Sequence, residues 1–187
     1  MGRKGQERGS GGVRDEFVER AMADYEGPLL GYAMGILHDL ERARDVVQDT
    51  FIRLCQQDRE KVGRGLKTWL YTVCRNRALD VLRKDRRLVE FEEGQAERIE
   101  STAAGPDQAA DWDERVGQVM KALGRLSANQ REVIGLKFQQ GMSYREISEA
   151  TGLSTGNVGF LLHTGLKRLR SLLPDDLLDR EVKLRER

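Results

Sequence analysis

The sequence predicts an all-α protein of two small helical domains joined by a flexible acidic linker. Apolar residues recur at three- and four-residue spacing in two long stretches, which is the period of amphipathic helices. No stretch shows the strict alternation that is typical of a half-buried strand. Between Arg87 and Asp113 the helical period fails, and that segment is acidic and contains a Gly-Pro pair. A chain of 187 residues has room for two small domains beside such a linker.

These signals divide the chain into five parts. Residues 1–12 are rich in glycine and low in hydrophobicity, so we expect a disordered tail there. Residues 13–87 and 115–173 are expected to form the two helical domains. Residues 88–114 are expected to form the linker, and residues 174–187 a short C-terminal tail.

The first domain is expected to hold three helices. The apolar residues of the first are Leu29, Tyr32, Ala33, Ile36 and Leu37. The second spans residues 43–55, and its apolar stripe lies opposite a polar face of Asp45, Gln48, Asp49 and Arg53. The third runs from about Leu66 to Arg83, after a stretch, "DREKVGRG", that its glycines mark as a loop. The residues that this helix should bury are Leu66, Leu70, Val73, Cys74, Val81 and Leu82.

The second domain contains two predicted capping boxes, Ser127 with Gln130 and Ser143 with Glu146. The second box opens a helix over residues 144–150, and a glycine turn and Ser154 lead into a longer helix that ends near Leu173. Two helices across such a turn indicate a helix-turn-helix, whose second helix offers its N-terminal residues to the DNA major groove. An ordinary helical hairpin with a basic end remains the alternative.

The charges are segregated along the chain, although the formal net charge is only +1. Residues 64–87 hold eight lysines and arginines against two aspartates, a local net charge of +6. Residues 88–114 have a net charge of −8, and residues 115–173 again have +6. Two basic modules around an acidic segment favour a nucleic-acid partner.

The composition argues against several other classes of protein. Cys55 and Cys74 lie far from either histidine and form no CxxC, so we expect buried thiols on helix faces and no metal site or cofactor. No Walker loop, Gly-x-Ser-x-Gly motif or paired acid and base is present, which argues against an enzyme. Without a signal peptide or a long apolar run, we expect a soluble cytoplasmic protein with no membrane partner.

Three motifs together resemble those of the extracytoplasmic-function (ECF, group IV) sigma factors, the minimal two-domain initiation factors of bacterial transcription. They are D-x-x-Q-D-x-F in "RARDVVQDTFIRL", W-L-Y-x-x-x-x-N-x-x-x-D-x-x-R in "KTWLYTVCRNRALDVLRKDRR", and the helix-turn-helix in "MSYREISEATGLSTGNVGFLLHTGLKRLR". The resemblance covers about residues 20–173. It implies a factor that binds core RNA polymerase, recognises minus-35 and minus-10 promoter elements and promotes DNA melting.

The resemblance implies that the helix from Trp69 to Arg87 completes the first domain's core and also faces the minus-10 element. Melting requires a pocket for a flipped base, here largely residues 59–67, and positive charge along the strand. The implied contacts are Arg64, Lys67, Asn76, Arg77, Asp80, Arg83, Lys84, Arg86 and Arg87. Trp69 is expected in the core rather than as a stacking platform. A role for Asp80 in bracing Arg77 or Lys84 stays open.

The helix over 43–55 resembles the family's docking surface for the clamp helices of the polymerase large subunit, with Asp45, Gln48, Asp49 and Arg53 as the implied contacts. The second domain is expected to meet the flap of the same subunit. The acidic linker is expected to thread the catalytic cleft and RNA exit path, unless it is only a tether or masks the two basic modules. An anti-sigma factor remains open as a further partner.

The resemblance places the minus-35 contacts mainly on the second helix of the helix-turn-helix. They are Lys137, Tyr144, Ser154, Thr155, Asn157, Gly159, Phe160, His163, Thr164, Lys167 and Arg168. The family usually carries basic residues where this chain has Gly159 and Thr164. Because few arginines remain to read guanine, we expect an A/T-tolerant element read partly through DNA shape. Gly165 is expected to pack against a neighbouring helix.

Two other functions compete with a sigma factor. A helix-turn-helix regulator with an N-terminal sensing or dimerisation domain explains the second module but leaves "WLYTVCRNRALDVLRK" unexplained. A nucleic-acid enzyme or an interaction adaptor lacks any catalytic constellation. Co-purification with core polymerase separates the three.

Overall fold

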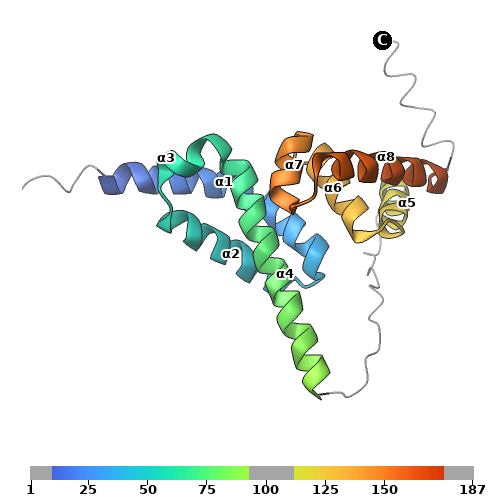
Figure 1. Ribbon diagram of the computed structural model, residues 1–187, viewed down its shortest axis with the longest axis horizontal. Helices are drawn as coiled ribbons and strands as arrows, with labels where there is room; N and C mark the ends of the chain where they lie inside the picture. The colour runs from blue at the N-terminus through green and yellow to red at the C-terminus, as the bar shows by residue number, and fades with distance from the viewer. Residues whose placement is uncertain (1–9, 93–111, 175–187) are drawn as a thin grey trace, which may run out of the picture. The chain divides into compact units, whose positions relative to one another are not determined.

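The computed structural model describes residues 10–92 and 112–174, and every regular element in that part of the chain is a helix. The predicted all-α class is confirmed. The chain divides into two compact units, which are described separately. The first contains α1 to α4, and the second contains α5, α6, α8 and α7 up to Ser148 (Figure 1). None of the described helices is long and apolar enough to cross a bilayer.

The first unit consists of α1 (Ser10–Leu37), α2 (Leu40–Gln56), α3 (Arg59–Val62), the short 3-10 helix η1 (Gly63–Gly65) and α4 (Leu66–Glu92). Helices α1, α2 and α4 pack against one another in all three combinations. The side chain of Asp39 begins α2 by accepting a hydrogen bond from the Arg42 backbone N–H at 3.1 Å. That cap explains why the helix starts three residues before the expected position 43.

The expected loop at residues 59–67 is wrong, because α3 and η1 occupy most of it and α4 has begun by Leu66. The carboxylate of Asp58 accepts a hydrogen bond from the Glu60 N–H at 3.0 Å, which starts the turn. Val62 is buried and anchors this segment to the unit. Helix α4 also continues past Arg83 to Glu92, since no glycine or proline interrupts the chain before Gly94.

The buried face of α4 differs in part from the predicted one. Leu70 and Cys74 are fully buried as expected, but Leu66, Val73, Val81 and Leu82 are only half-buried. Tyr71 and Ala78 are fully buried instead. The Tyr71 ring meets the Tyr32 ring of α1 edge-on, with the centroids 5.0 Å apart. Because α1 and α2 both pack on α4, they cover a face that includes position 71, and hydrophobic spacing alone does not show this.

The second unit consists of α5 (Trp112–Gly124), α6 (Ala128–Phe138), α7 (Tyr144–Thr151) and α8 (Thr155–Leu172). Both predicted capping boxes are confirmed, at the starts of α6 and α7. Gly152 closes α7 in the left-handed conformation, with φ +74°, where a side chain would be strained. Ser154 then caps α8 by accepting a hydrogen bond from the Asn157 N–H at 3.2 Å. These local signals produce the helix-turn-helix.

Gly165 lies where α8 packs against α6. It is buried, and a Cβ at this position would stand 3.0 Å from Ile134 Cδ1 and 3.3 Å from Gln130 Cβ. The expected packing of Gly165 against a neighbouring helix is therefore confirmed.

We expect Gly165→Ala to destabilise the protein in urea unfolding followed by circular dichroism. Overpacking costs about 1–3 kcal/mol, whereas alanine in place of glycine in a helix gains at most about 1 kcal/mol. The matched control is Gly117→Ala in α5, where a Cβ meets nothing within 4 Å, so this change should stabilise the protein. Equal gains for both substitutions would contradict the packing argument.

Candidate nucleic-acid and polymerase interfaces

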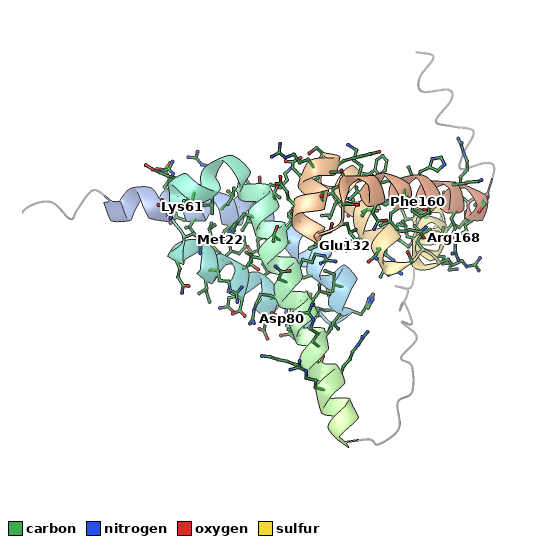
Figure 2. All side chains as sticks on the ribbon, in the orientation of Figure 1. Met22, Lys61, Asp80, Glu132, Phe160 and Arg168 are labelled. Atoms are coloured by element: carbon green, nitrogen blue, oxygen red, sulfur yellow. The ribbon has the colours of Figure 1, made fainter. Side chains whose placement is uncertain are left out.

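The C-terminal half of α4 carries an exposed basic cluster. Lys84, Arg86 and Arg87 are all exposed to solvent, and Asn76 is exposed on the same helix. Figure 2 shows long side chains projecting from α4 on the C-terminal side of Asp80. No ion pair joins Lys84, Arg86 or Arg87 to any of the described residues at close range. Their charges are available to a polyanion.

Asp80 forms an ion pair with Arg83, one turn further along α4, at 2.9 Å. The sequence left open a role for Asp80 in bracing Arg77 or Lys84, and neither is its partner in this pair. Both side chains are about half exposed or more, so the pair lies at the surface. Arg83 thus remains on the basic surface, with part of its charge neutralised by Asp80.

Arg77 pairs with Asp49 of α2. The sequence placed these two residues in different interfaces, Arg77 with DNA and Asp49 with polymerase, but the fold brings them together. The Arg77 side chain is only 28% exposed, and its Nε is buried without a hydrogen-bond partner among the described residues. The guanidinium is therefore held against α2.

The start of α4 contains the remaining predicted minus-10 residues. Lys67 and Trp69 are half-buried, while Thr68 and Leu70 beside them are buried. The Trp69 ring thus contributes to the core and keeps part of its surface in contact with solvent. Arg64 lies within η1, and its side chain falls outside the part of the structure that is described.

One face of α2 is polar and exposed, as the sequence predicted. Asp45, Gln48 and Arg53 are exposed, whereas Asp49 turns toward α4. Ile52 was not predicted as a site residue, yet it is 48% exposed on this face, four residues after Gln48 and seven after Asp45. The sequence could have indicated this residue, because an isoleucine stands at a helical position that shares the face of Asp45 and Gln48. The exposed face of α2 therefore combines charge with one large apolar side chain.

Most of the predicted minus-35 residues are exposed on α8. Ser154, Thr155, Asn157, Phe160, His163, Lys167 and Arg168 form this group. Phe160, labelled in Figure 2 with Arg168, is 64% exposed, so its ring is accessible to a partner. The hydroxyl of Ser154 also caps the helix, so its polar group has an internal partner.

Four other predicted minus-35 residues contact the protein itself. The hydroxyl of Thr164 accepts a hydrogen bond from Gln130 at 3.2 Å and donates one to the Phe160 carbonyl at 2.8 Å. Lys137 donates to the Met142 carbonyl at 3.3 Å, and its ammonium lies 5.5 Å from the centre of the Tyr144 ring. A Cβ on Gly159 would stand 3.6 Å from the same ring. These residues stabilise the helix-turn-helix in the free protein.

The two cysteines differ in their surroundings, so the expectation of two buried thiols is wrong for Cys55. Cys55 is exposed near the end of α2, where the helix turns this position to solvent. Cys74 is fully buried, and burial raises the pKa of its thiol to about 12, although a hydrogen bond with Thr50 opposes the shift.

We expect an aromatic disulfide reagent at pH 8 to modify one thiol per native chain and two after unfolding. The thiolate is the reactive form, and a raised pKa keeps Cys74 protonated throughout the pH range of such assays. Rapid reaction of a Cys55→Ser variant under native conditions would contradict this assignment.

Two helical units, one with a basic helix end and the other with a helix-turn-helix, define a two-domain DNA-binding protein of transcription. Residues 21–88 match the family model for sigma-70 region 2, and residues 117–169 match that for sigma-70 region 4. The chain is 30% identical over 181 residues to the ECF RNA polymerase sigma factor SigX of Bacillus subtilis, covering 92% of this chain and 93% of SigX. It is 33% identical over 161 residues to SigL of Mycobacterium tuberculosis, covering 83% and 89%.

Among solved structures, the chain resembles the sigma factor RpoE of Bartonella quintana, crystallised with the anti-sigma factor NepR. The TM-score is 0.65 at 30% identity, and the match covers 82% of this chain and 94% of that one. The chain belongs to the ECF RNA polymerase sigma factors. As a sigma factor it binds core RNA polymerase, recognises promoter elements and promotes DNA melting for transcription initiation. The match to region 2 accounts for the residues that a simple helix-turn-helix regulator left unexplained.

Proposed function

We propose that the residues described above divide the work of this sigma factor between three surfaces. The basic cluster in the C-terminal half of α4, with Lys84, Arg86 and Arg87, holds the opened strand at the minus-10 element. The exposed face of α2, with Asp45, Gln48, Ile52 and Arg53, docks on the clamp helices of the large polymerase subunit. The exposed N-terminal half of α8 reads the minus-35 element.

The proposal rests mainly on the exposed basic cluster in the C-terminal half of α4. The three cations have no ion-pair partner among the described residues. Because like charges repel, their proximity destabilises the free domain. A nucleic-acid backbone compensates that repulsion and releases bound counterions. Asn76 and Arg83 precede this cluster on α4 and are proposed to contact the same strand. Lys67 and Arg64 belong to the segment proposed to form the base pocket.

The function is tested by reconstituting the full chain with core polymerase and measuring transcription from its own promoter. Promoter-specific transcripts that depend on the chain support it. Promoter binding by the chain without any association with core enzyme would contradict this function and favour a helix-turn-helix regulator.

We further infer that base reading at minus-35 depends on Asn157, Phe160 and His163. Their exposure supports contact with base edges, where asparagine suits adenine and an apolar ring suits the thymine methyl group. Lys167 and Arg168, one to three turns further along α8, suit phosphates. Since Lys137, Tyr144, Gly159 and Thr164 support the motif internally, the direct readout is confined to few side chains, which favours an A/T-tolerant element read partly by shape.

We expect alanine at Lys167 and alanine at Asn157 or His163 to have different effects on DNA binding. Loss of a phosphate contact should lower affinity evenly across sequences and reduce the salt slope by about one. Loss of a base contact should relax preference at one position and cost about 1–3 kcal/mol there. A binding selection with each variant separates the two, and a strict G/C-rich motif indifferent to Asn157 and His163 would refute the assignment.

Three further partner contacts are proposed from the family. The second unit is inferred to meet the polymerase flap, and the acidic segment 88–114, largely outside the described residues, to enter the basic nucleic-acid channel of the polymerase. An anti-sigma factor is a further candidate partner, because the RpoE relative was solved with one. The factor is proposed to work in the cytoplasm, as a group IV member, and to bind without catalysing a reaction of its own.

A further inference from the structure

Among the side chains that the structure describes, two ion pairs connect α2 to α4, and we call them the α2–α4 brace. The first joins Asp49 of α2 to Arg77 of α4, and the second joins Arg42 of α2 to Asp85 of α4. The two positions on α2 are seven residues apart and those on α4 eight, about two helical turns in each case. The helices run in opposite directions, so both pairs form in a single register.

The two ion pairs of the brace have opposite charge orientation. In one pair the carboxylate comes from α2, and in the other it comes from α4. A slide of two turns in one direction would place Asp49 against Asp85, and a slide in the other would place Arg42 against Arg77. Like charges that meet in this way repel, so the brace favours the observed register over both two-turn slides.

The Asp49–Arg77 pair is the less exposed of the two. Its side chains are 40% and 28% exposed, and the buried Nε of Arg77 has no hydrogen-bond partner among the described residues. Removing either partner would leave a partly buried charge without compensation. The guanidinium of Arg77 and the carboxylate of Asp49 therefore each have a partner within the first unit.

We propose that the α2–α4 brace sets the register between the polymerase-docking face of α2 and the basic cluster in the C-terminal half of α4. Asp49 and Arg77 are then positioning residues, which act through the helices that they join. This inference rests on the proposed roles of α2 and α4. When α2 docks on the polymerase, the brace holds the basic cluster of α4 at a defined distance from that surface.

The test is a charge-swap cycle in the full chain, assembled with core polymerase. Asp49→Lys and Arg77→Glu should each slow open-complex formation at least tenfold, and the double variant should return it to within about threefold of the original rate. A second double variant, Asp49→Leu with Arg77→Met, keeps the helices packed without charge and should recover similarly. The control is the swap Glu16→Arg with Arg20→Glu, an exposed pair within α1, which should change nothing.

Recovery of both core affinity and opening by either double variant supports the brace. If the double variants recover core affinity but not the opening rate, Arg77 contacts DNA. If they recover the opening rate in a saturated holoenzyme but not core affinity, Asp49 contacts polymerase. Either result overturns the inference, as does failure of both double variants when circular dichroism shows native helicity. If instead the proposed docking face is wrong, substitutions at Asp45 and Ile52 leave core affinity unchanged while the charge-swap cycle still shows coupling.

Discussion

Substitution of Asp45 by lysine together with Ile52 by aspartate should weaken the binding of core RNA polymerase roughly tenfold to a hundredfold. The first change reverses a charge on the exposed face of α2, and the second removes the large apolar side chain of that face. Charge reversal at an interface mainly slows association, whereas loss of a buried apolar contact mainly speeds dissociation. Surface plasmon resonance with immobilised core enzyme measures both rates.

Both residues are exposed, so the free energy of unfolding should change by no more than about 0.5 kcal/mol. The matched control is Glu19→Lys, a charge reversal at an exposed position of α1 away from the proposed face. Asp49 is left intact because its substitution would also break the α2–α4 brace. Unchanged core affinity in the double variant would remove α2 from the docking surface.

Replacing Lys84, Arg86 and Arg87 together by alanine should slow open-complex formation about tenfold or more at physiological salt. Each contact to a single-stranded phosphate contributes about 0.7 to the slope of log affinity against log salt, so the slope should become shallower by about two. Opening rates measured at several salt concentrations give this slope. A template already opened at the minus-10 element should recover much of the loss, because the free energy of melting is no longer required.

The control for this triple variant is Arg20→Ala, an exposed arginine of α1 paired only along its own helix. It removes a charge without touching α4, and its opening rate should match that of the original protein. An equal deficit of the triple variant on duplex and pre-opened templates, with an unchanged salt slope, would assign the defect to docking or folding.

Much of this architecture follows from short-range patterns in the chain. The capping boxes at Ser127 and Ser143 and the turn at Gly152 involve residues within a few positions of one another. They can therefore be predicted from the sequence without knowledge of the fold. The same holds for the all-α class, the helix-turn-helix and the exposed charges of α4 and α8. Hydrophobic spacing shows which side chains share a helix face, and local hydrogen bonding shows where a helix begins.

Contacts between distant residues required the packed structure. The pairing of Asp49 with Arg77, the hydrogen bond between Gln130 and Thr164, and the full burial of Tyr71 each depend on which helix covers a given face. The period of an isolated helix contains no information on its neighbours, and several ion-pair partners were available to every charged residue. Helix packing brought one partner within reach and gave Arg77, Asp49 and Thr164 internal contacts that the sequence did not predict, while leaving Ile52 uncovered on α2.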